Sequence, residues 1–134
     1  MAVLVLDASA FVELVLRSDA GREVEDHLRG ATVAVPAHFD AEAFSALGRL
    51  VRAEEVAEER MEAAIGLLAT APFTRYAVAP LLQASWALRH DLWLRDALYV
   101  TLAQQLEATL LTADSRLAAA PGLEVALVVM GDSG

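Results

Sequence analysis

The stretch Ala2-Val3-Leu4-Val5-Leu6 is an unbroken apolar run that is followed at once by Asp7. A strand with one face in water alternates apolar and polar residues, whereas a strand covered on both faces is apolar throughout. The run therefore predicts a buried strand in a parallel sheet. Since ligands of open parallel sheets collect beyond the carboxyl ends of the strands, Asp7 stands where a functional residue is expected.

Further along the chain, segments typical of strands and of helices alternate. The other strand candidates are Thr32 to Val35, Phe73 to Val78, Ala108 to Thr112 and Glu124 to Met130. Apolar residues at helical spacing predict helices over Ala10 to Arg17, Ala20 to Arg29, His38 to Arg52, Glu55 to Leu68, Leu81 to Arg89, Leu94 to Leu106 and Ser115 to Ala119. This order favours an α/β fold with a mainly parallel central sheet and right-handed crossovers. We expect one domain over residues 1–130 and a frayed tail over 131–134.

The composition is that of a folded acidic domain. The 134 residues are 57% hydrophobic, and 10 basic side chains stand against 19 acidic ones, which gives a formal net charge of −9. Because cysteine and lysine are absent, disulfides, thiolate metal sites, thiol nucleophiles and catalytic lysines are excluded. The negative charge argues against a surface built wholly for nucleic acid, so a nuclease of this composition needs a local group of arginines.

No uncharged stretch reaches the roughly 18 residues of a membrane span. No basic leader precedes the first strand, as a signal peptide would require. We therefore expect a cytoplasmic protein that has no contact with a membrane.

Four acidic residues stand at or near the ends of predicted strands, namely Asp7, Glu42, Asp96 and Asp114. Asp7 and Asp114 are also well placed to cap the helices that follow them, and capping alone would explain each. Asp96 falls inside the apolar arc of its helix, where an acid that faces solvent is not expected. Glu42 lies at one edge of an apolar stripe and Asp40 at the other, and the pattern does not choose between them.

If the four acids converge, their repulsion raises their pKa values unless a cation neutralises them. Mg²⁺ and Mn²⁺ prefer oxygen ligands such as carboxylates, and they can activate water for in-line displacement at phosphorus. The pattern thus predicts metal-dependent hydrolysis of phosphodiester bonds.

Four motifs resemble those of PIN-domain ribonucleases, in the same order and across almost the whole chain. They are Val5-Leu6-Asp7-Ala8-Ser9, the run from Val35-Pro36 through Glu42 to Ala46-Leu47, Asp96-Ala97-Leu98-Tyr99 with Leu102-Ala103, and Leu111-Thr112-Ala113-Asp114-Ser115-Arg116-Leu117. Within that family the chain is most similar to the VapC-type toxins of bacterial type II toxin–antitoxin pairs. One departure is Arg95, which stands where the family usually has an aromatic residue.

The resemblance implies a PIN-like three-layer sandwich with a catalytic cluster that binds Mg²⁺ or Mn²⁺. Its members would be the four acids Asp7, Glu42, Asp96 and Asp114. Ser9 and Thr112 would be supporting hydroxyls beside the cluster, and a local turn or cap hydrogen bond is the equally weighted alternative for both.

The implied activity is hydrolysis of RNA to 5′-phosphate and 3′-hydroxyl products, which would inhibit translation and growth. The implied partners are a cognate VapB-like antitoxin and a second copy of the chain in a homodimer. Arg95 and Arg116, which adjoin two of the acids, are candidates for binding substrate phosphate, with an ordinary surface role as the alternative.

Two other functions stay open. The chain could be a catalytically silent PIN-like fold kept as a binding or structural partner. A magnesium-dependent phosphoacceptor signalling domain would also carry acids at its strand ends, but such domains hold the phosphoryl group with a lysine, which this chain lacks.

The remaining aromatic and imidazole groups suggest no second site. Trp86 and Trp93 could stack on bases, but packing in the core or in an interface is the favoured interpretation. His27, His38 and His90 are too scattered for a metal triad, and we expect each at the surface or at its boundary.

Overall fold

The computed structural model describes residues 2–120 and 127–129. It contains a five-stranded sheet in the order β3-β2-β1-β4-β5, in which every neighbouring pair is parallel. The strands are β1 (Val3–Leu6), β2 (Thr32–Pro36), β3 (Thr74–Tyr76), β4 (Thr109–Thr112) and β5 (Leu127–Val129). The predicted parallel sheet is confirmed, and β1 occupies its centre.

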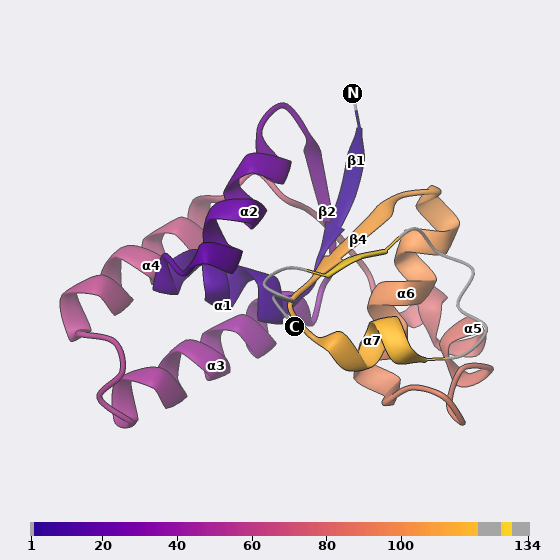
Figure 1. Cartoon of the computed structure of the whole chain (residues 1–134). Helices are drawn as coiled ribbons and strands as arrows, with labels where there is room; N and C mark the ends of the chain where they lie inside the picture. Colours follow the sequence, from indigo (N-terminus) through magenta and orange to yellow (C-terminus); the bar gives the residue numbers. More distant parts are fainter. Residues whose placement is uncertain (1, 121–126, 130–134) are drawn as a thin grey trace.

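Helices cover both faces of the sheet (Figure 1). On one side lie α1 (Ala8–Leu16), α2 (Asp19–Leu28), α3 (Phe39–Arg52) and α4 (Glu58–Thr70), and on the other lie α5 (Leu82–Trp86), α6 (Leu94–Leu106) and α7 (Ser115–Ala119). The expected three-layer architecture is therefore confirmed. Among the described helices, none combines the length and the apolar character that crossing a bilayer requires.

The core explains why the first strand is apolar throughout. Val5 and Leu6 are completely buried between the two helical layers. Phe11 of α1 and Phe39 of α3 pack edge to face with their ring centroids 5.6 Å apart, and α6 contributes the buried Val100. A central strand with helices on each face has no side open to water, so the polar positions of an alternating pattern are missing.

Several element boundaries differ from the predicted ones. The helix predicted over Leu81 to Arg89 is a 3₁₀ turn, Ala79–Leu81, followed by the short α5. Beyond α5, the amides of Leu88 and Arg89 donate to carbonyls three residues back, so the chain continues in tight turns.

The helix predicted from Glu55 begins only at Glu58, where α4 starts. Glu54 adopts a positive φ of 58°, and the amide of Glu55 donates to the carbonyl of Leu50. These contacts terminate α3, and a new helix needs a few residues to restart. The last predicted strand appears as Leu127–Val129, while residues 124–126, Met130 and the tail 131–134 lie outside the described residues.

The strand order creates a crevice beside β1. From β1 the chain moves along the sheet to β2 and β3, and it then returns to build β4 and β5 on the other side of β1. Such a reversal leaves a gap between the carboxyl ends of β1 and β4, and ligands of this fold class bind in such a gap. The amide of Asp7 donates to the carbonyl of Leu111 at 3.1 Å, so the ends of β1 and β4 lie side by side there.

Candidate active site

A cleft of about 600 Å³ opens at this crevice, and the four predicted acids line it together. Asp7 directly follows β1 and Asp114 lies two residues beyond β4. Glu42 comes from α3, and Asp96 comes from the first turn of α6. Residues that are widely separated in the sequence therefore share one concave surface. Asp40, the alternative to Glu42, instead pairs with Arg75 outside this cleft.

Asp7 is held by two hydroxyl groups. The hydroxyls of Ser9 and Thr112 donate to its two carboxylate oxygens, the second at 2.5 Å. Ser9 also accepts from the amide of Ala113 at 2.9 Å, and Thr112 accepts from the amide of Asp114 at 3.0 Å. These contacts join the turn after β1 to the turn after β4, so the two supporting residues orient the carboxylate and link its neighbours.

Capping also contributes to the position of Asp7, since its carboxylate accepts from the amides of Ser9 and Ala10 at the start of α1. The side chain is buried, with 5% exposed, and burial raises the pKa of Asp7 although all four of these hydrogen bonds oppose the shift. Because the pKa of Asp7 stays raised despite these hydrogen bonds, a cation bound nearby would stabilise its ionised form.

Glu42 has a different environment. Its Oε1 accepts from the hydroxyl of Tyr99 at 2.6 Å and lies 3.2 Å from Nε2 of His38, while Arg95 approaches Oε2 at 3.8 Å. Burial raises the pKa of Glu42, but the hydrogen bonds from His38 and Tyr99, together with the charges of His38 and Arg95, lower it on balance. The side chains around Glu42 therefore favour its ionised form.

Asp96 is half-buried in the cleft. Burial raises its pKa, and the negative charges of Asp114 and Asp7 raise it further, while Arg95 and Arg116 act in the opposite sense. This mutual repulsion is the effect expected where carboxylates approach one another without a cation between them.

Asp114 pairs with Arg116, which follows it by two residues. The guanidinium donates from Nε at 2.9 Å and from Nη2 at 2.6 Å, and this contact lowers the pKa of Asp114. Asp114 also caps α7 by accepting from the amide of Arg116. A capping role and a place in the cleft therefore coexist in Asp114, as they do in Asp7.

Within residues 2–120 and 127–129, no three acidic or imidazole groups are arranged closely enough to hold one metal ion together. The existing contacts provide a reason, because Glu42 is directed toward Tyr99 and His38, and Asp114 toward Arg116. The cleft thus gathers the acids without presenting their oxygens around a single point.

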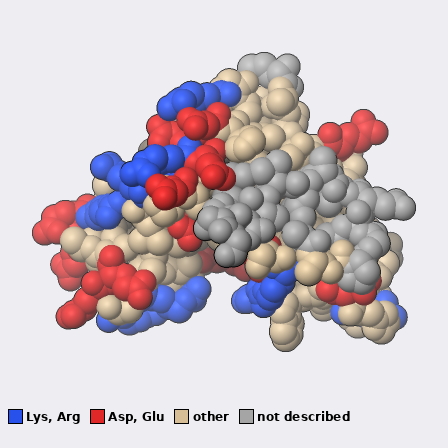
Figure 2. All heavy atoms as spheres, viewed as in Figure 1, with Lys and Arg blue, Asp and Glu red and all other residues tan. Residues whose placement is uncertain are grey.

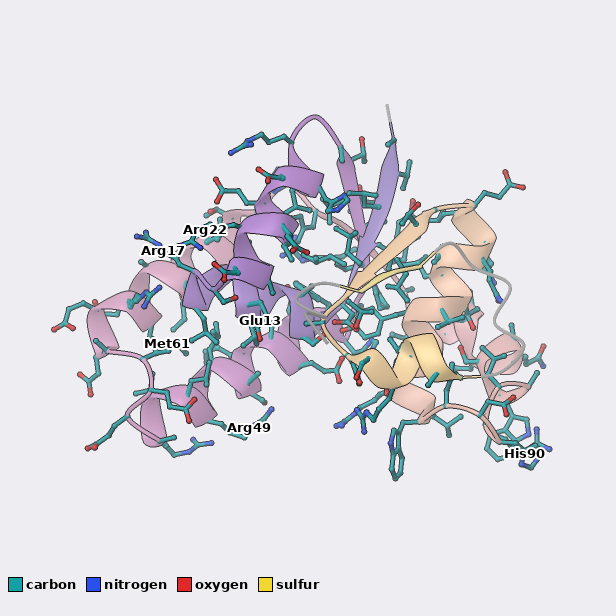
Figure 3. All side chains as sticks on the ribbon, viewed as in Figure 1. Glu13, Arg17, Arg22, Arg49, Met61 and His90 are labelled. Carbon is teal, nitrogen blue, oxygen red and sulfur yellow. The ribbon has the colours of Figure 1, made fainter. Side chains whose placement is uncertain are left out.

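Sequence reasoning missed several residues of the cleft. Tyr99 and His38 were not singled out as partners of Glu42, although the spacing of Tyr99, one helical turn after Asp96, places both on the same face of α6. Glu13 of α1 and Arg49 of α3, both labelled in Figure 3, extend the lining of the cleft along these helices.

Of the two places expected for the tryptophans, the core or an interface, the core is wrong for both. Trp86 is 56% exposed and Trp93 is 67% exposed. Trp86 is the last residue of α5 and Trp93 immediately precedes α6, and their sequence neighbours Ser85 and Leu92 are buried while the indoles lie on the outside. Whether either ring packs in an interface remains a prediction.

Comparison with known proteins agrees with this architecture. The family model for the PIN domain matches residues 4–123. Ribonuclease VapC3 of Mycobacterium tuberculosis is 45% identical over 87% of this chain and 86% of the relative, and Ribonuclease VapC1 of the same organism is 42% identical over 92% and 96%.

Solved structures share the fold at lower identity. The Mycobacterium tuberculosis toxin VapC20, described as a Sarcin-Ricin loop cleaving toxin, superposes with a TM-score of 0.66 at 20% identity and covers 92% of this chain and 98% of its own. The VapBC2 complex from Rickettsia felis, bound to a promoter DNA fragment, gives a TM-score of 0.66 at 14% identity, with 96% of this chain and 98% of that chain covered.

Proposed function

Since this chain belongs to the PIN-domain family of VapC ribonucleases, we propose that it is an endoribonuclease that hydrolyses RNA phosphodiester bonds as the toxin of a toxin–antitoxin pair. The observation that carries the proposal is the meeting of Asp7, Glu42, Asp96 and Asp114 in one cleft at the carboxyl edge of the sheet. A protein kept only as a binding partner has no need for partly buried, mutually repelling acids.

The cleft is proposed to bind Mg²⁺ or Mn²⁺. Carboxylate oxygens are the ligands that these ions prefer, and the raised pKa of Asp96 beside Asp7 and Asp114 reflects negative charge that a cation would neutralise. Asp7, Asp96 and Asp114 would hold the ion, with Glu42 as the fourth acid. When bound, such an ion supplies Lewis-acid activation of water and stabilisation of charge at phosphorus.

The chain's own residues divide the remaining work. Ser9 and Thr112 fix the carboxylate of Asp7, and His38 and Tyr99 keep Glu42 ionised. Arg95 and Arg116 bring guanidinium groups to the cleft. Each guanidinium can donate two parallel hydrogen bonds to the phosphate oxygens of the substrate. The guanidinium of Arg116 is paired with the carboxylate of Asp114, so binding of RNA phosphate by Arg116 would free that carboxylate.

The proposed partners are an antitoxin and a second copy of the chain. Solved structures of this fold include a toxin–antitoxin complex from Klebsiella pneumoniae with a TM-score of 0.61. A cleft lined by acids suits an arginine from an antitoxin, because a guanidinium would neutralise the same carboxylates that a metal ion uses.

Cleavage of a labelled RNA by the purified chain tests the proposal. We expect Mn²⁺ or Mg²⁺ to support cleavage with 5′-phosphate products, EDTA to abolish it, and Asp96→Asn to lower it by at least about a hundredfold. Glu59→Gln, an exposed acid of α4 outside the cleft, is the matched control and should leave the rate unchanged. Equal cleavage by wild type and Asp96→Asn, or cleavage that persists in EDTA, would contradict the proposal.

A further inference from the structure

A second pocket, of about 360 Å³, adjoins the cleft. It shares Asp96 and Arg116 with the cleft, and the loop between α5 and α6 supplies most of the rest of its wall, including Arg89, His90 and Trp93. His90 is labelled at the lower right of Figure 3. Because Asp96 and Arg116 line both the cleft and this pocket, an extended ligand that lies in the cleft can continue into the pocket.

Trp93 lines this pocket, but its exposed indole contributes little to the packing of the fold. The indole is 67% exposed and stands three residues before Asp96. Arg89 lies over the ring of Trp86 at 4.6 Å, whereas none of the aromatic or cation–π pairs in the described part of the chain involves Trp93. Exposing a large apolar ring to water is unfavourable, and an aromatic ring beside an acidic cleft suits a flat ligand that stacks on it.

The charges around the pocket suit a nucleotide. The chain as a whole carries a formal net charge of −9, and Figure 2 shows some of its arginines dispersed among acidic side chains over the face formed by α1 to α4. This pocket is lined by two guanidinium groups, of Arg89 and Arg116, and by two carboxylates, of Asp91 and Asp96. A ligand with one planar base and one phosphate matches an exposed indole beside a guanidinium.

We propose that Trp93 and Arg116 form a subsite for a nucleotide of single-stranded RNA next to the bond that is cut, with the base stacked on the indole and a neighbouring phosphate bound by the guanidinium. This inference rests on the proposed ribonuclease function. Single-stranded RNA is required because a base within a duplex already stacks on its neighbours and cannot present its face to a side chain.

Binding of a fluorescein-labelled single-stranded RNA oligonucleotide, followed by anisotropy in EDTA, tests the subsite apart from catalysis. We expect Trp93→Ala to weaken binding by about tenfold or more and Trp93→Phe to retain most of the affinity, since a phenyl ring still stacks. Trp86→Ala removes the same side chain outside this pocket and should stay within about twofold of wild type. In Trp86→Phe, where Trp93 is the sole indole, RNA should quench the tryptophan fluorescence.

The outcomes separate the subsite from the activity. If wild type and Trp93→Ala bind RNA equally, or if wild type binds no single-stranded RNA, the subsite is wrong. Should Trp93→Ala change the sedimentation of the protein while RNA binding stays the same, the indole belongs to a protein interface. If Trp93 is needed for binding but the wild type cleaves no RNA with either metal, the subsite stands and the proposed function fails.

Discussion

The ionised form of Asp96 destabilises the folded protein. Burial and the charges of Asp114 and Asp7 raise the pKa of Asp96 above the value that it has in the unfolded chain. The folded protein therefore keeps this proton to higher pH than the unfolded chain does. Stability from this group is complete below the unfolded pKa and is lost as pH rises through the folded pKa.

The sign of this effect predicts the behaviour of Asp96→Asn. In EDTA the variant should unfold at a higher temperature than wild type at about pH 7, and the difference should shrink toward about pH 4. Glu42→Gln is the control of opposite sign, because the pKa of Glu42 is lowered and its ionised form stabilises the fold at neutral pH. Thermal unfolding across this pH range measures both, and an Asp96→Asn protein that is less stable than wild type at neutral pH would contradict the interpretation.

Tyr99 acts on the cleft through Glu42. Tyr99→Phe removes a 2.6 Å hydrogen bond to the carboxylate while it preserves the buried ring, so we expect a loss of about 1.5 kcal/mol in the free energy of unfolding. Urea denaturation measures the loss, and Tyr76→Phe in β3 serves as the control for removing a tyrosine hydroxyl. A change below about 0.5 kcal/mol would mean that water replaces the contact.

Among the helices, α1 and α2 approach each other so closely that α2 requires a glycine at the point of contact. A Cβ atom added to Gly21 of α2 would lie 2.1 Å from the carbonyl oxygen of Glu13 in α1. Ser18 supports the same junction, since it caps α2 and its hydroxyl donates to Oε2 of Glu13 at 2.6 Å. The position of Glu13 in the cleft thus depends on this packing.

Two alanine substitutions separate close packing from helix propensity. Gly21→Ala should lower the free energy of unfolding by about 2 to 3 kcal/mol, because backbone atoms must move to admit the methyl group. Gly66→Ala in α4 has nothing within 4 Å of the added atom and should raise it by about 0.5 to 1 kcal/mol through helix propensity. Urea denaturation of both variants decides, and a neutral Gly21→Ala would show that the helices can separate without cost.

For the whole molecule, the cleft joins segments that the sheet brings together from both sides of β1. An ion bound there would bind only the folded state, in which these segments meet. It would therefore stabilise the entire domain rather than one element.

We expect Mn²⁺ at ten times its Kd to raise the Tm of wild type by about 5 °C, which corresponds to about 1.4 kcal/mol. Asp96→Asn should show a much smaller rise, and Glu59→Gln, outside the cleft, the full rise. Differential scanning calorimetry with and without the ion gives the comparison. The same rise in Asp96→Asn as in wild type would place the ion elsewhere.

The parallel sheet, the order of the elements and the acids at the ends of β1 and β4 could all be predicted from the amino-acid sequence. These features depend on local properties, namely the apolar period, helix-capping residues and the positions where strands end. The helix Leu94–Leu106 could be predicted to the residue because its apolar arc is broad, whereas α4 began late since the end of α3 depends on backbone contacts with Leu50.

The contacts between side chains of different elements became known only from the folded chain. It selected Glu42 over Asp40 for the cleft, brought Tyr99 and His38 to Glu42, and left Trp93 exposed beside Asp96. Contacts between elements depend on how the crossovers pack across the sheet, and no spacing within one segment encodes that distance or direction.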